Sequence, residues 1–148
     1  MTNVIPTPAG WSWRDIATLV ARLIFAALFA MAVTFKLIGM SETAAYITAA
    51  GFPMPLLLAW LATILELALV IAFLTGAYFT EAALLAAAYV LFLGFAFHGP
   101  NRWAGNQSEF GFFIDHFTFI AGLLLAAVHG PGRKLASRLS VLTRSDSA

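Results

Sequence analysis

The stretch WLATILELALVIAFLTG, residues 60–76, is a run of apolar side chains interrupted near its middle by one carboxylate, Glu66. A segment of this length and hydropathy can cross the hydrocarbon core of a bilayer as a helix. A carboxylate inside such a span is costly unless it is paired, protonated or in contact with water. The stretch therefore predicts a membrane-spanning fold and a partner for Glu66.

The composition of the whole chain leads to the same class of protein. Of its 148 residues, 61% are hydrophobic and 10% are charged, whereas soluble domains are about 45–50% apolar and about 25% charged. A water-soluble domain of this size cannot bury so much apolar surface. The chain is therefore expected to be an integral membrane protein that lies in a lipid bilayer.

Charge and cysteine content narrow the possible functions. The net charge of +1 gives no indication of a nucleic acid partner. The absence of cysteine excludes a disulfide relay and thiolate-held iron–sulfur or zinc sites within this chain. Any redox role would need a bound organic cofactor, a site built from histidine and carboxylate, or a partner subunit.

Four apolar runs approach the length of about 20 residues that a membrane-spanning helix needs. Lipid offers no partner to backbone polar groups, so each run is expected to be helical. We predict an all-α, four-helix membrane bundle over residues 16–130, preceded by a short segment, 1–15. The expected spans are 16–38, 56–74, 82–97 and 110–128.

Residues 131–148 form a basic tail. Lys and Arg next to spans favour the cytoplasm, and an even number of helices places both termini on one side. Both termini are therefore predicted to be cytoplasmic. A cleavable signal peptide is the competing interpretation of the N-terminus, but the first apolar run is long and contains Arg22. Between the first two spans, Ser41 can serve as N-cap of a short interfacial helix.

Counting along adjacent antiparallel helices suggests a partner for Glu66. At about 1.5 Å per residue, Arg22 lies roughly 9 Å inside the first span and Glu66 roughly 12 Å inside the second. Two opposite charges in a low dielectric are far less costly together than apart. We therefore predict a structural ion pair between Arg22 and Glu66.

A second polar group gathers toward the opposite membrane face. Asp115 and His116 lie together inside the fourth span, where ionisable residues are functional candidates by default. Phe112, Asp115 and Phe119 share one stripe of that helix, and Glu109 and His116 share the neighbouring stripe. Lys36 and His98 end the first and third spans at the same level.

Each of these residues also has a structural interpretation. The ion pair can be only a clamp, Lys36 can extend to the lipid headgroups, and His98 can simply end a helix. Phenylalanines at helical spacing usually pack. A metal site drawn from His98, Glu109, Asp115 and His116 is chemically possible, but its spacing matches no known ligand signature, so no metal is predicted.

The chain resembles the DoxX family of small four-helix bacterial membrane proteins. The resemblance covers about residues 21–134 and rests on ARLIFAALFAMAVTFKLIG in the first span and on the continuous AAYITAAGFPMPLLLAWLATILELALVIAFLTG. Arg22, Lys36, Glu66 and the connection Gly51-Phe52-Pro53-Met54-Pro55 match the family pattern, as does His98 at the end of the third span. Where many members have glycines after the glutamate, this chain has Leu67, Ala68 and Leu69.

The resemblance implies a multi-pass protein of the bacterial inner membrane. Family members are often described as oxidoreductases or as subunits of quinone-linked systems, so the first hypothesis is a redox subunit that binds a quinone between its helices. In it, Asp115 and His116 would exchange protons with the ligand. The ligand-contacting residues would be Lys36, His98, Glu109, Phe112 and Phe119.

Two alternatives stay open at this level. The protein can be a non-catalytic assembly or anchoring subunit, bound to a partner membrane or redox subunit or to further copies of itself. A small transporter is the other alternative, although four helices are few for a transport path and no inverted repeat is visible.

Overall fold

The computed structural model describes residues 10–137 and 139. Parts of the predicted N-terminal segment and of the basic tail, with Arg138 and Arg144, lie outside these residues. The described part is all-helical, with no strand. Its elements are α1 (Trp13–Ile38), α2 (Met40–Ala49), α3 (Pro55–Thr75), α4 (Phe79–His98), the short 3-10 helix η1 (Pro100–Arg102) and α5 (Gln107–His129).

Four helices, α1, α3, α4 and α5, are long and apolar enough to cross a membrane. This confirms the predicted fold class, an integral membrane bundle of four spanning helices. Each predicted span lies within the corresponding helix, which extends it by at most three residues at either end. The largest difference at the third span is at its start, because α4 begins at Phe79.

Local sequence explains where these helices begin and end. Ser12 and Asp15 form a capping box at the start of α1, and Pro55 occupies the first turn of α3, where its missing N–H costs nothing. Gly76 ends α3 with a φ of 72°, a conformation that favours glycine. The predicted interfacial helix forms as α2, but its N-cap is Gly39 and not Ser41, because α1 and α2 are separated by that single residue.

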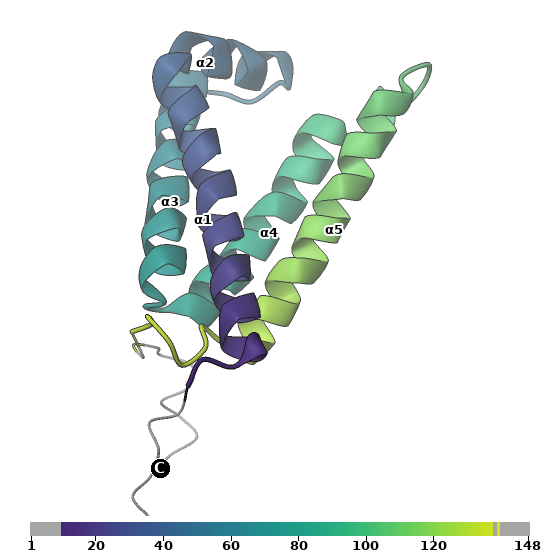
Figure 1. The fold of residues 1–148 in the computed structure, drawn as a ribbon. Coiled ribbons are helices and arrows are strands. Elements are labelled where there is room, and N and C mark those ends of the chain that lie inside the picture. The colour runs from purple at the N-terminus through teal and green to yellow at the C-terminus, as the bar shows by residue number, and fades with distance from the viewer. Residues whose placement is uncertain (1–9, 138, 140–148) are drawn as a thin grey trace, which may run out of the picture.

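The helices pair as two hairpins that diverge from one end of the molecule (Figure 1). The most extensive packing joins α1 with α3 and α4 with α5, and α2 packs across α3. We call the end where the hairpins meet the tail end, and the opposite end the α2 end. Near the tail end, the aromatic core consists of Phe25, Phe29, Phe73, Phe79 and Phe119, whose rings lie 5.4–5.9 Å apart.

Arg22 holds the tail end together. Its side chain is 1% exposed, and all five of its N–H groups find backbone carbonyls as acceptors. Nε donates to Phe73 O at 3.1 Å, and Nη2 donates to Leu74 O at 2.8 Å. The remaining bonds reach the segment after α5, from Nη1 to Pro131 O and Lys134 O and from Nη2 to Leu135 O, at 3.0–3.3 Å. One guanidinium therefore caps α3 and fixes the returning chain.

The predicted Arg22–Glu66 ion pair is wrong. Side chains on a helix lean toward its N-terminus. On antiparallel α1 and α3 they therefore lean in opposite directions, so Arg22 extends toward the end of α3 while Glu66 extends toward the α2 end. In addition, the start of α1 and the end of α3 do not lie at the same depth. Arg22 already reaches the last turn of α3, and residues 13–21 of α1 continue beyond it.

Replacing Arg22 tests this capping role. Arg22→Lys keeps the charge but cannot satisfy five carbonyls in two directions, so we expect a loss of about 3 kcal/mol in unfolding free energy. Thermal unfolding in mild detergent measures it. Arg14→Lys, at an exposed position of the same helix, is the matched control. Equal stability of the Arg22→Lys and Arg14→Lys variants would contradict the capping role.

Candidate functional site

Glu66 has its partners on two other helices. The Nζ of Lys36 donates to both carboxylate oxygens of Glu66 at 2.8 Å. The hydroxyl of Tyr89, on α4, donates to Oε1 at 2.8 Å. Glu66 is 2% exposed, whereas the side chain of Lys36 is 19% exposed. Three helices, α1, α3 and α4, therefore meet at one carboxylate near the middle of α3.

Lys36 and Tyr89 neutralise and hydrogen-bond the carboxylate of Glu66. A buried carboxylate is stable only when it is paired and its lone pairs are used, and here an ammonium and a phenol do both. Tyr89 was not singled out from the sequence. The available signal was a phenol in the otherwise apolar stretch AAAYVLF (residues 86–92), because a buried tyrosine hydroxyl needs a hydrogen-bond partner.

Two cavities flank the cluster. The first, about 800 Å³, lies between α1, α4 and α5, with walls that include Phe25, Phe29 and Phe119. It occupies the space where α1 and α5 diverge toward the α2 end, and it is open to the surroundings. The second, about 890 Å³, extends beneath α2 between α3 and α4. Ala32, Tyr89, Leu93, His98 and His116 line both cavities, so the two adjoin.

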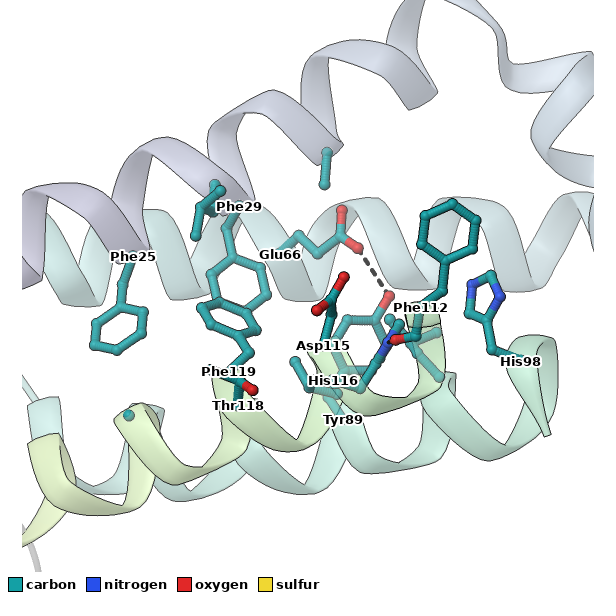
Figure 2. Close-up of a pocket in the computed structure, with 15 residues that line it drawn as sticks. Phe25, Phe29, Glu66, Tyr89, His98, Phe112, Asp115, His116, Thr118 and Phe119 are labelled. Carbon is teal, nitrogen blue, oxygen red and sulfur yellow. Dashed lines mark hydrogen bonds between the residues drawn. The ribbon is translucent and has the colours of Figure 1, made fainter. Parts of the chain in front are cut away.

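Asp115 faces the first cavity (Figure 2). It lies in the middle of α5, on the side turned toward Glu66, and its side chain is exposed to the cavity. Among the described residues it makes no hydrogen bond or ion pair. An ionisable group at this depth that does not serve the protein's own packing is a candidate for chemistry on a bound molecule.

His116 and His98 continue the polar lining toward the α2 end. Nδ1 of His116 lies 2.6 Å from Phe112 O, and Nδ1 of His98 lies 2.7 Å from Oε2 of Glu109. The two imidazole centroids are 5.3 Å apart. Gly94 makes room for His116, since a Cβ at that position would lie 3.3 Å from the histidine side chain.

The structure brings the predicted site residues together, but in two different situations. Asp115, His116, Phe112 and Phe119 line the first cavity, and His98 lines both. Lys36 and Glu109 are instead already engaged, by Glu66 and by His98 respectively. Lys36 also lines the second cavity directly. Within the described part of the chain, no three histidine or acidic side chains converge to hold a metal ion.

Aromatic contacts close the second cavity at the α2 end. Tyr46 stacks on Phe97 with ring centroids 5.1 Å apart, and Phe52 lies 5.8 Å from Phe92 and 5.9 Å from Phe97. Burial raises the pKa of the Tyr46 phenol, and the nearby Glu109 carboxylate adds to the rise while Arg102 opposes it. Tyr46 therefore stays a neutral hydrogen-bond donor over the physiological pH range.

The Lys36–Glu66 pair is tested by a double-mutant cycle. Lys36→Met leaves a buried carboxylate without its cation, so we expect a loss of about 3 kcal/mol in unfolding free energy. Adding Glu66→Gln recovers much of that loss, because an amide needs no counter-charge. Tyr89→Phe removes one hydrogen bond and costs about 1 kcal/mol. Detergent unfolding of the four variants of the cycle measures the coupling energy.

The control cycle pairs Arg22→Met with Glu66→Gln. These side chains have no shared partner, so their effects should add. Coupling between Arg22 and Glu66, together with additivity of Lys36 and Glu66, would contradict the observed pairing.

Comparison with known proteins agrees with this architecture. The sequence pattern of the DoxX family matches residues 17–99, which include Arg22, Lys36, Glu66 and His98. The chain is 34% identical over 129 residues to "Inner membrane protein YqjF" of Escherichia coli (strain K12), an alignment that covers 85% of this chain and 93% of that protein. No solved structure matches the chain. The family match and the similarity to this relative show that the chain belongs to the DoxX family.

Proposed function

We propose that this DoxX-family protein is a membrane subunit of a redox system and binds a quinone, or a lipophilic molecule of the same chemistry, between its two helix hairpins. The supporting observation is the first cavity, where an unengaged carboxylate and two imidazoles meet aromatic walls inside the membrane-spanning region. We further propose that the protein lies in the bacterial inner membrane, as the name of its Escherichia coli relative states for that protein.

The size and lining of the cavity suit an amphiphilic ring. Ligand sites are typically about 300–1,000 Å³ and mostly apolar with few polar groups, and the cavity of about 800 Å³ has this character. Phe25, Phe29 and Phe119 offer ring faces, while Asp115 and His116 offer hydrogen-bonding groups at the level of Glu66. An aromatic headgroup with carbonyl or hydroxyl oxygens matches this combination.

The position of the opening favours a ligand that comes from the membrane. α1 and α5 approach each other through Phe25, Phe29 and Phe119 near the tail end and diverge beyond them. Both faces that border the opening belong to membrane-spanning helices. A molecule that enters between them must partition into hydrocarbon, as a prenylated quinone does and a polar metabolite does not.

The residues divide the work in this proposal. Asp115 and His116 exchange protons with the oxygens of the headgroup, because an imidazole or carboxylate in hydrogen-bond reach is the usual general acid or base. His98 donates or accepts at the other side of the headgroup, and Phe112 and Phe119 hold the ring. The Lys36–Glu66–Tyr89 cluster keeps the hairpins at the spacing that leaves the cavity open.

Binding is tested with the purified full chain and a fluorescence-quenching quinone. We expect saturable binding, weakened about tenfold by Phe119→Ala because one ring contact is lost. Phe117→Ala is the matched control on the same helix, since Phe117 packs against Phe95 and Phe113 and lines neither cavity. Absence of saturable binding, or equal weakening by the two variants, would contradict the proposed site.

The proton-exchange role is tested in membranes of the host. Asp115→Asn preserves shape, so quinone affinity should change little while quinone-linked electron transfer falls about 10²-fold. If Asp115→Asn leaves that rate unchanged, Asp115 has no part in the reaction. Loss of a co-purifying partner in the Phe119→Ala variant, without any quinone binding by the wild type, would instead favour the assembly-subunit alternative.

A further inference from the structure

The polar lining of the first cavity continues from Asp115 toward the α2 end. Figure 2 shows Asp115 and His116 on α5, followed by His98 at the end of α4, in a row that leads away from the aromatic core. The next group in that direction is Glu109, in the first turn of α5 and bonded to His98. On the other side of Asp115, toward the tail end, the cavity is lined by Phe25, Phe29 and Phe119.

The hydrogen bonds of His98 suit it to pass a proton through its ring. With Nδ1 donating to the Glu109 carboxylate, Nε2 of the neutral imidazole is an acceptor. A proton that arrives at Nε2 allows the Nδ1 proton to leave to Oε2 of Glu109, 2.7 Å away. The ring is then the Nε2–H tautomer, which has to lose that proton and regain one at Nδ1 before the next transfer.

His116 can transfer a proton to His98 from its Nε2, but it cannot pass a proton through its own Nδ1. Its Nδ1 faces Phe112 O, and a carbonyl can only accept a hydrogen bond. Nε2 of His116 is thus the atom that takes and returns a proton. The 5.3 Å between the ring centroids is short enough for one water or one ligand oxygen to join the two imidazoles.

The path ends at Glu109, in the first turn of α5, and the residues around it are held by hydrogen bonds. The indole Nε1 of Trp103 donates to His98 O at 2.8 Å, which fixes the end of α4. Asn106 caps α5 at the backbone N–H of Glu109. The side chain of Glu109 is 21% exposed, so it can exchange protons with water.

Charged and titratable groups also face the two imidazoles from the other packed elements. They are Lys36 from α1, Glu42 and Tyr46 from α2, Glu66 from α3, Tyr89 from α4 and Asp115 from α5. Glu66 is engaged by Lys36 and Tyr89. Of these groups, Asp115 alone stands at the start of the path as an unengaged acid.

We propose that His98 and Glu109 form a proton path that connects the ligand cavity to the α2 end of the protein. This inference rests on the proposed function for the origin of the proton, the O–H group of a bound hydroxylated ring. Each transfer breaks one O–H or N–H bond and forms another, from ligand oxygen to Nε2 and from Nδ1 to Glu109. No electron moves in these steps, so no oxidant is required.

The test follows imidazole protonation after a pH jump in the full chain, by infrared spectroscopy in lipid nanodiscs. Lipid should cover the opening between α1 and α5, so that protons reach the imidazoles from the α2 end, either along this path or through the second cavity. We expect Glu109→Gln to slow protonation of the cavity imidazoles about 10²-fold. Glu109→Asp should retain most of the rate, because it keeps a carboxylate. Glu42→Gln, which changes a carboxylate that lines the other cavity at the α2 end, should leave the rate unchanged.

A rate in Glu109→Gln equal to that of the wild type would overturn the path, and so would equal slowing by Glu42→Gln. Quinone binding measured on the same preparations separates this result from the proposed function. Binding with an unaffected proton rate leaves the quinone site and removes the path. A slowed rate without quinone binding supports the path and removes the quinone as its proton source.

Discussion

A carboxylate in the middle of a membrane-spanning helix must be neutralised, and the neutralisation of Glu66 organises the interior of this protein. The ammonium of Lys36 and the phenol of Tyr89 reach it from two other helices. Such a cluster costs more to break than it contributes over an apolar replacement. It therefore fixes where α1, α3 and α4 lie relative to one another, and thereby where space remains between the hairpins.

Arg22 is a second buried charge, at the tail end, and it is satisfied in a different way. It meets no carboxylate but saturates its five donors on backbone carbonyls of α3 and of the segment after α5. The hairpins are thus joined at one end by a guanidinium and aromatic packing, and at the other by the aromatic contacts that Tyr46 of α2 and Phe52 of the following connection make with α4. Between these two ends lie the cavities, lined both by the Lys36–Glu66–Tyr89 cluster and by Asp115, which makes no hydrogen bond among the described residues.

The spans were predictable because hydropathy and length are decided locally. The partner of Glu66 was not predictable in this way. Counting depth along a helix gives only the position of each Cα, whereas the side chains of Arg22 and Glu66 extend away from each other. Three of the five carbonyls that accept from Arg22 belong to residues 131–135, whose return to α1 has no local signal in the sequence. The grouping of Asp115, His116 and Phe119 on neighbouring faces followed from helical periodicity, but the two adjoining cavities depend on how the hairpins diverge.

The central claim is that a quinone-like molecule occupies the space between the hairpins. Photoaffinity labelling with an azido-quinone in native membranes, followed by peptide mapping, tests it most directly. Binding in the first cavity predicts labels on Phe25, Phe29, His116 or Phe119, suppressed by excess unlabelled quinone. Labels confined to lipid-facing positions such as Ile64 or Leu125, or labels that excess quinone does not suppress, would contradict the claim.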